Sequence, residues 1–186
     1  MDNFHIQDSC SASVTRNAGK TEGYKTGGYY TVECHAADGS FKWKDDIHNL
    51  VTTVGLNLTC DTVLGNSAAG AIYMGLKGTG TASAADTQAS HATWNEVGLA
   101  NAPTYTGNRQ TPTFSAASGG VKTTSSAVVF SMTSSGTVAG CFINIGGSAT
   151  KDSTTGTLFS AGDFTAGSKI VTSGDTLSVS YTLTAA

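Results

Sequence analysis

Turn-forming clusters recur at short, regular intervals through the second half of this 186-residue chain. Each cluster contains Gly, and most add Ser, which is the chemistry that tight turns require. The clusters lie at 118–120, 134–136, 146–147, 166–167 and 173–175. Their spacing is typical of the strands of a β-sandwich. The pattern therefore predicts an all-β fold, an antiparallel β-sandwich of the jelly-roll or Ig-like kind.

The expected strands follow from the alternation of apolar and polar residues between the turns. In the last strand, Leu177, Val179 and Tyr181 alternate with hydroxyl residues and are expected to face the core. Near the other end, Asp38 and Gly39 predict a tight hairpin. The candidate strands are 29–35, 40–44, 71–77, 91–97, 111–116, 127–133, 137–145, 156–160, 169–172 and 176–184.

One short helix is expected between the first hairpin and the strand at 71–77. Apolar residues recur there at three- and four-residue intervals, namely Ile47, Leu50, Val51, Val54 and Leu58. The acidic pair Asp45 and Asp46 suits a helix start, and Gly65 suits a stop. An interruption is expected near Gly55.

The chain is long enough for one domain with a substantial core. Residues 1–27 show no sustained period and are predicted to form an extended N-terminal arm, and residues 28–186 a single β-sandwich domain. Only 12% of the residues are charged, and the net charge is −3. Such a surface argues against a nucleic-acid partner. It suggests a hydroxyl-rich surface that is partly covered by neighbouring proteins, although a free-standing β-domain with an uncharged surface is the simpler alternative.

The sequence also argues against a membrane partner. The longest apolar runs are far too short to span a bilayer. The N-terminus lacks the basic and apolar regions of a signal peptide, which suggests synthesis in a cytoplasm.

Candidate chemistry is sparse. Asp45, Asp46 and His48 could begin a catalytic group, because a carboxylate can orient an imidazole. No motif frames a nucleophile, and the simpler interpretation is a capped helix start with an interfacial His. We therefore expect no enzyme activity and no catalytic residue.

Metal and cofactor sites are not expected either. The four cysteines form no C-x-x-C pair, and the four histidines lie far apart in the sequence. The glycine-rich segment 78–80 lacks the lysine of a phosphate-binding loop.

Aromatic residues in a β-sandwich usually belong to the core, and an anchor in a protein interface is the main alternative. Both interpretations, core residue or interface anchor, apply to Trp43, Trp94, Tyr73 and Phe164. The candidate interface residues are Tyr24, Trp43, His48, Asn49 and Trp94.

Several stretches of the sequence resemble small virion proteins of tailed bacteriophages. These stretches are Lys42 with Trp43, 47–52, 55–57, 73–78, the trio His91, Trp94 and Glu96, 160–164 and 173–181. The match runs from about Gly28 to Thr184. It carries no chemical signature.

The resemblance implies a structural component of the phage particle, most similar to a head decoration (cement) protein. Such a protein would be made in the bacterial cytoplasm, would bind the major capsid protein on the capsid surface of the virion, and would strengthen contacts between capsid subunits. Self-association is expected, as a homotrimer suited to local threefold positions of a shell. The alternative is a tail-fibre or head-fibre component that binds a host surface glycan.

Overall fold

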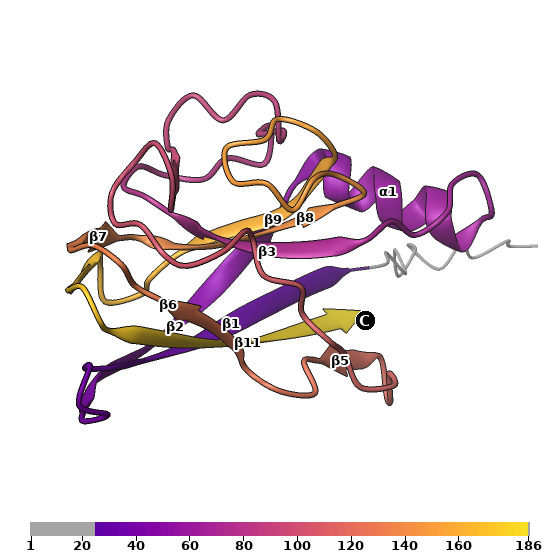
Figure 1. Ribbon diagram of the computed structural model, residues 1–186. Helices are drawn as coiled ribbons and strands as arrows, with labels where there is room; N and C mark the ends of the chain where they lie inside the picture. Colours follow the sequence, from indigo (N-terminus) through magenta and orange to yellow (C-terminus); the bar gives the residue numbers. More distant parts are fainter. Residues whose placement is uncertain (1–24, 186) are drawn as a thin grey trace, which may run out of the picture.

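The computed structural model describes residues 25–185, which form two layers of antiparallel strands (Figure 1). The elements are β1 (Thr26–His35), β2 (Phe41–Val51), α1 (Thr53–Val63), β3 (Ile72–Lys77), β4 (Glu96–Val97), β5 (Val121–Thr123), β6 (Val128–Ser131), β7 (Gly136–Val138), β8 (Gly140–Ile145), β9 (Thr157–Asp163), β10 (Lys169–Val171) and β11 (Thr176–Ala185). The predicted all-β sandwich with one short helix is confirmed. Except for its last three residues, the predicted arm lies outside the described residues, and Thr26 already pairs with Ala185.

One strand connects the two layers. The lower layer in Figure 1 consists of β2, β1 and β11, with β5 and β6 both paired to β11. The upper layer consists of β9, β8, β3 and β4. Most of β2 pairs with β1, but its last residues, Leu50 and Val51, pair with Ala161 and Ser160 of β9. The sheet therefore continues from one layer into the other through β2, while β7 and β10 form a separate ribbon.

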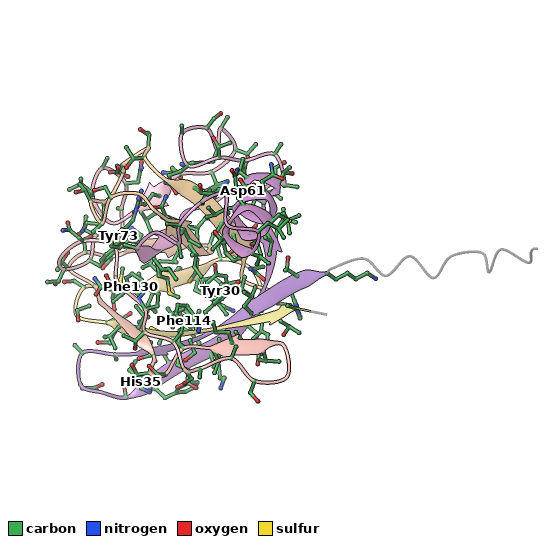
Figure 2. The ribbon with its side chains drawn as sticks, turned by 90° about the vertical axis from the view of Figure 1, so that its right-hand side faces the viewer. Tyr30, His35, Asp61, Tyr73, Phe114 and Phe130 are labelled. Atoms are coloured by element: carbon green, nitrogen blue, oxygen red, sulfur yellow. The ribbon has the colours of Figure 1, made fainter. Side chains whose placement is uncertain are left out.

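The main core lies between the layers. Alternate residues of β1 and β11 are buried there, namely Tyr30, Val32, Cys34, Leu177, Val179 and Tyr181. Figure 2 places Tyr30 and Phe130 in this interior. Complete burial of a large apolar side chain stabilises the fold by roughly 1.5–3 kcal/mol. The alternation predicted for the last strand is confirmed.

A second cluster covers the opposite side of the upper layer. Trp94, from the loop before β4, packs against Phe142 of β8 and against Leu158 and Ala161 of β9. The side chains of β8 are consequently buried on both faces of the strand, from Gly140 through Asn144. The upper layer is thus enclosed on both sides, whereas within residues 25–185 the lower layer has the core on one side only (Figure 1).

The predicted helix start at Asp45 and Asp46 is wrong. Both residues lie in β2, which continues to Val51, and α1 begins only at Thr53. Asp45 faces inward, where its carboxylate accepts hydrogen bonds from two backbone amides and pairs with Lys169 at 2.9 Å. The apolar spacing misled the prediction because Ile47 and Val51 are inward residues of a strand, while the later members of the series belong to the helix.

The predicted interruption near Gly55 is also wrong, since Gly55 lies in the first turn of α1. The Thr52 side chain caps the helix by accepting a hydrogen bond from the Gly55 amide at 3.1 Å. A Cβ atom at position 55 would collide with the backbone of Phe159 in β9. Glycine therefore allows the helix to pack directly on the sheet.

The other strand predictions are confirmed or corrected by the pairing. The Asp38–Gly39 hairpin is present, with Gly39 at a φ of 83°. In the predicted strand 91–97 only Glu96–Val97 pairs, and 111–116 contributes just the bridge between Phe114 and Thr124. The predicted strand 137–145 is divided at Ala139, because β7 pairs with β10 and β8 with β3 and β9. The short strand β5 was not predicted.

A buried ion pair orders the loops above the upper layer. The guanidinium of Arg109 donates to the Glu96 carboxylate at 3.0 Å from Nε and 2.6 Å from Nη2, and both side chains are almost fully buried. Its remaining hydrogen bonds reach the carbonyl oxygens of Ser148 and Ser153, at 3.1 and 2.8 Å. One side chain therefore connects β4 with the loop between β8 and β9.

Two buried lysines also donate hydrogen bonds to backbone carbonyl oxygens of these loops. Lys77, at the end of β3, pairs with Asp163 and donates to the carbonyl oxygens of Gly78 and Gly80. Lys151 donates to the carbonyl oxygen of Tyr105 at 2.8 Å and lies over the ring of that residue. Burial lowers the pKa of Lys151, although the nearby carboxylates of Glu96 and Asp152 oppose the shift.

We predict that Arg109→Met strongly destabilises the protein, because it leaves the Glu96 carboxylate buried without its counter-charge. The free energy of unfolding should fall by about 3–5 kcal/mol, measured by urea unfolding followed by tryptophan fluorescence. Lys44→Met is the matched control, because Lys44 forms an exposed pair with Glu33 and its loss should change stability little. A loss no greater than that of the control would mean that the buried pair does not stabilise the loops.

Candidate functional site

The outer face of the lower layer is the candidate interface. Residues of β1 that alternate with the core residues point to this face, and the strand register places each of them between one residue of β2 and one of β11. The rows are His48–Tyr29–Thr182, Asp46–Thr31–Ser180 and Lys44–Glu33–Ser178. We call these nine residues the outer face.

Hydroxyl groups and a few charged side chains dominate the outer face. Thr31 donates a hydrogen bond from Oγ1 to the Asp46 carboxylate at 2.7 Å. In the neighbouring row, Lys44 pairs with Glu33 at 2.9 Å. The hydroxyls of β11 continue the rows, and each can both donate and accept a hydrogen bond. Because the charges are largely paired, the outer face suits a neutral polar partner surface better than a polyanion.

Apolar side chains occur singly on and beside this face. Tyr29 is 45% exposed, and Val129 of β6, which pairs with Ser178 in register, is 47% exposed. Isolated apolar residues of this kind are common on soluble proteins and do not form a patch. They can still act as anchors, because tyrosine contributes strongly when a partner covers it.

The structure separates the predicted interface residues. His48 lies on the outer face, whereas Trp43 and Asn49 are on the inward side of β2. Trp94 is only 5% exposed, and its Nε1 donates to Asp86 at 2.9 Å. Tyr24 lies outside the described residues. That the five residues contact a partner stays a prediction. Of those within residues 25–185, only His48 lies on the outer face.

The two tryptophans pack against other aromatic side chains. The Trp43 ring meets Phe164 edge to face, with centroids 5.4 Å apart. The Trp94 ring is covered by His91, which stacks on it with centroids 4.0 Å apart. Both indole rings are thus engaged in contacts with aromatic side chains of this chain.

The outer-face hydroxyls of β11 were missed as candidate site residues. The signal was present, since Ser178, Ser180 and Thr182 alternate with the core residues of the same strand. The alternation alone does not reveal whether a further layer covers those residues. Their exposure depends on which sheet the last strand joins.

The three residues considered for catalysis do not converge. Asp45 faces the interior, while Asp46 and His48 point to the outer face. The carboxylates of Asp45 and Asp46 are engaged by Lys169 and Thr31, respectively. Among residues 25–185, no group of three His, Cys, Asp or Glu side chains is placed to hold a metal ion.

A buried tyrosine pair supports the outer face from beneath. The rings of Tyr30 and Tyr181 lie 4.6 Å apart, on the neighbouring strands β1 and β11. The Tyr30 hydroxyl bonds to Ser160 of β9 at 2.8 Å, and Asn49 of β2 donates to the Tyr181 hydroxyl at 3.0 Å. Asn49 therefore helps to connect β2 with β11 inside the sandwich.

Burial perturbs the acid–base behaviour of this pair. It raises the pKa of Tyr181 to about 12, against the opposing effect of hydrogen bonds from Ser160 and Asn49. Burial likewise raises the pKa of Tyr30, and the proximity of Tyr181 adds to the shift. The folded state thus favours the neutral phenols.

Comparison with family models, with curated proteins and with solved structures found no match for this chain. Over the described range, no helix has the length and apolar character needed to cross a membrane.

We predict a loss of stability at alkaline pH that involves the buried tyrosines. Because the folded pKa of Tyr181 is raised, its contribution is fully present below the usual tyrosine pKa of about 10. The contribution is lost as pH rises from there through the folded value of about 12. Urea unfolding across this range should show a steep fall in the wild type and a shallower fall in Tyr181→Phe. An equally steep fall in both would contradict the assignment, whatever the variant's stability at neutral pH.

Proposed function

We propose that this chain is a non-enzymatic structural protein of a tailed-phage particle. It binds the outside of the assembled capsid, contacts the major capsid protein and stabilises the contacts between capsid subunits. The observation that carries the proposal is the outer face of the lower layer, which no segment of residues 25–185 covers. This face presents Thr31, Ser178, Ser180 and Thr182 with few unpaired charges.

The asymmetry of the sandwich supports a protein-binding role for this face. Loops cover the upper layer and bury the Trp94 cluster beneath them. The lower layer exposes strand faces whose hydroxyls can exchange hydrogen bonds with a polar partner. A typical stable interface buries about 800 Å² on each partner. The rows of three neighbouring strands offer a continuous surface for such contacts.

Repetition would supply much of the stabilisation. A protein placed over a junction adds contacts to several capsid subunits at once, and each further contact becomes intramolecular after the first. We propose a homotrimer, because that symmetry matches the local threefold positions of a shell. The protein then resides on the capsid surface of the virion.

A glycan-binding fibre role has less support. The aromatic rings considered for stacking on a sugar are those of the two tryptophans. Trp94 is buried under His91, and Trp43 packs against Phe164. We therefore favour the decoration role.

The first test is the number of copies of this chain in purified particles, measured by quantitative mass spectrometry against the major capsid protein. A decoration protein should approach the abundance of the capsid protein, and particles that lack it should release their genome at lower temperature. A handful of copies would indicate a fibre or tail component, and unchanged genome release would argue against a stabilising role.

We predict that Ser180→Arg weakens binding to particles, because it places a long charged side chain in the middle row of the outer face. The amount bound to particles stripped of this protein should fall at least about tenfold, or about 1.4 kcal/mol. Thr79→Arg is the control, since Thr79 is exposed in the loop after β3 of the upper layer. Both variants should keep the thermal unfolding midpoint of the wild type. Equal binding by both would exclude the outer face as the contact surface.

A further inference from the structure

An open apolar groove lies at the end of the sandwich that carries α1 and the end of β11. Its volume is about 310 Å³, and it is lined by Leu58, Val63, Ile72, Phe114, Ile145 and Leu183, among others. Figure 2 shows the molecule from this end, with Asp61 of α1 and Phe114 labelled on either side of Tyr30. The lining comes from α1, from β3, β5, β8, β9 and β11, and from the loops before β3 and β5.

The rim of the groove exposes further apolar surface. Val63, the last residue of α1, is 75% exposed, and Leu64, immediately after it, is 85% exposed. Val63 also lines the groove. Two adjacent apolar side chains so open to water would gain burial if a further segment lay in the groove. The groove and its rim thus form an apolar surface that nothing between residues 25 and 185 covers.

The described chain begins beside this groove. In the register of β1 and β11, Gly28 pairs with Leu183, which lines the groove, and Thr26 pairs with Ala185. The described chain therefore begins at this end, and 24 residues precede it in the sequence (Figure 1). Any apolar side chain among them is tethered close to an apolar surface.

The N-terminal sequence contains a matching pair of apolar residues. Phe4 and Ile6 are two residues apart, so an extended chain would place both on one side. The 18 residues 7–24 separate them from the start of the described chain. A chain of that length, if unstructured, spans about 25 Å, which is enough to return to a groove beside its own exit point.

We propose that Phe4 and Ile6 of the chain's own N-terminal segment occupy this groove and cover the end of α1. Tethering favours the segment of the same molecule, because its effective concentration at the groove is in the millimolar range or higher. The corresponding segment of a second copy is the competing occupant. The proposal does not depend on the decoration role.

Native cysteines allow a direct test on the full-length chain. Cys10 lies four residues after Ile6 and can carry a nitroxide once Cys60, which is exposed on α1, is replaced by Ser. Cys34 and Cys141 are buried in the core, and burial raises the pKa of both thiols, that of Cys34 to about 11, with the Asp175 carboxylate also raising it. The label should therefore react selectively at Cys10.

Paramagnetic broadening of methyl signals then reports where the segment lies. We expect the label to broaden the methyl signals of Ile72, Ile145 and Leu183 far more than that of Val129 on β6, and dilution should not change this. In the double variant Phe4→Ser/Ile6→Ser the docked population should fall at least about tenfold. Val14→Ser, which removes an apolar residue outside the pair, should leave the broadening intact.

Two results would overturn the proposal. Broadening at the groove that is equal in the wild type and the double variant would mean that the tether alone brings the label near. Broadening of the groove signals of unlabelled, isotope-enriched protein by labelled protein that is not enriched would assign the groove to the segment of a second copy. Phe4 and Ile6 precede β1 in the sequence, and the replaced Cys60 is exposed on α1, so loss of the fold should not obscure either result.

Discussion

The loops above the upper layer hold their shape because buried cations satisfy their backbone carbonyl groups. Lys77, Arg109 and Lys151 each donate hydrogen bonds to loop carbonyl oxygens, and Arg109 and Lys77 also pair with carboxylates. A chain with only ten lysines and arginines thus places at least three of them inside. A buried carbonyl group without a hydrogen-bond donor lowers the free energy of unfolding. In a sheet the neighbouring strand supplies the donors, and in these long loops the buried cations do.

The enclosed upper layer gives the molecule two different sides. Trp94 and the loop around it seal the outer surface of β8 and β9. The lower layer has no such cover in the described part of the chain, and its outer face consists of paired charges and rows of hydroxyls. A partner that approaches the protein therefore meets an ordered strand surface on one side and packed loops on the other. This difference is the reason for proposing that a protein partner binds the outer face of the lower layer.

The two proposed contacts lie on different surfaces of the sandwich. The outer face is polar and formed by β1, β2 and β11, whereas the groove is apolar and lies beside α1, with β11 as the one strand that contributes to both. Tyr181 is near both, since it lines the groove and packs with Tyr30 beneath the outer face. Its neutral, hydrogen-bonded phenol keeps the intervening core intact. The two surfaces can therefore be occupied at the same time.

The sequence by itself determined the fold class, most strand positions and the hairpin at Asp38, because turn chemistry and period-two alternation are local properties of the chain. It did not determine where β2 ends and α1 begins, since Ile47 and Val51 fit either period until β9 pairs with the end of β2. Only the tertiary structure decided that Trp94 is buried and that Ser180, which is half-buried, lies on the outer face. Whether a side chain is buried depends on which segment, distant in the sequence, packs over its face of the sheet. The local sequence pattern does not specify that segment.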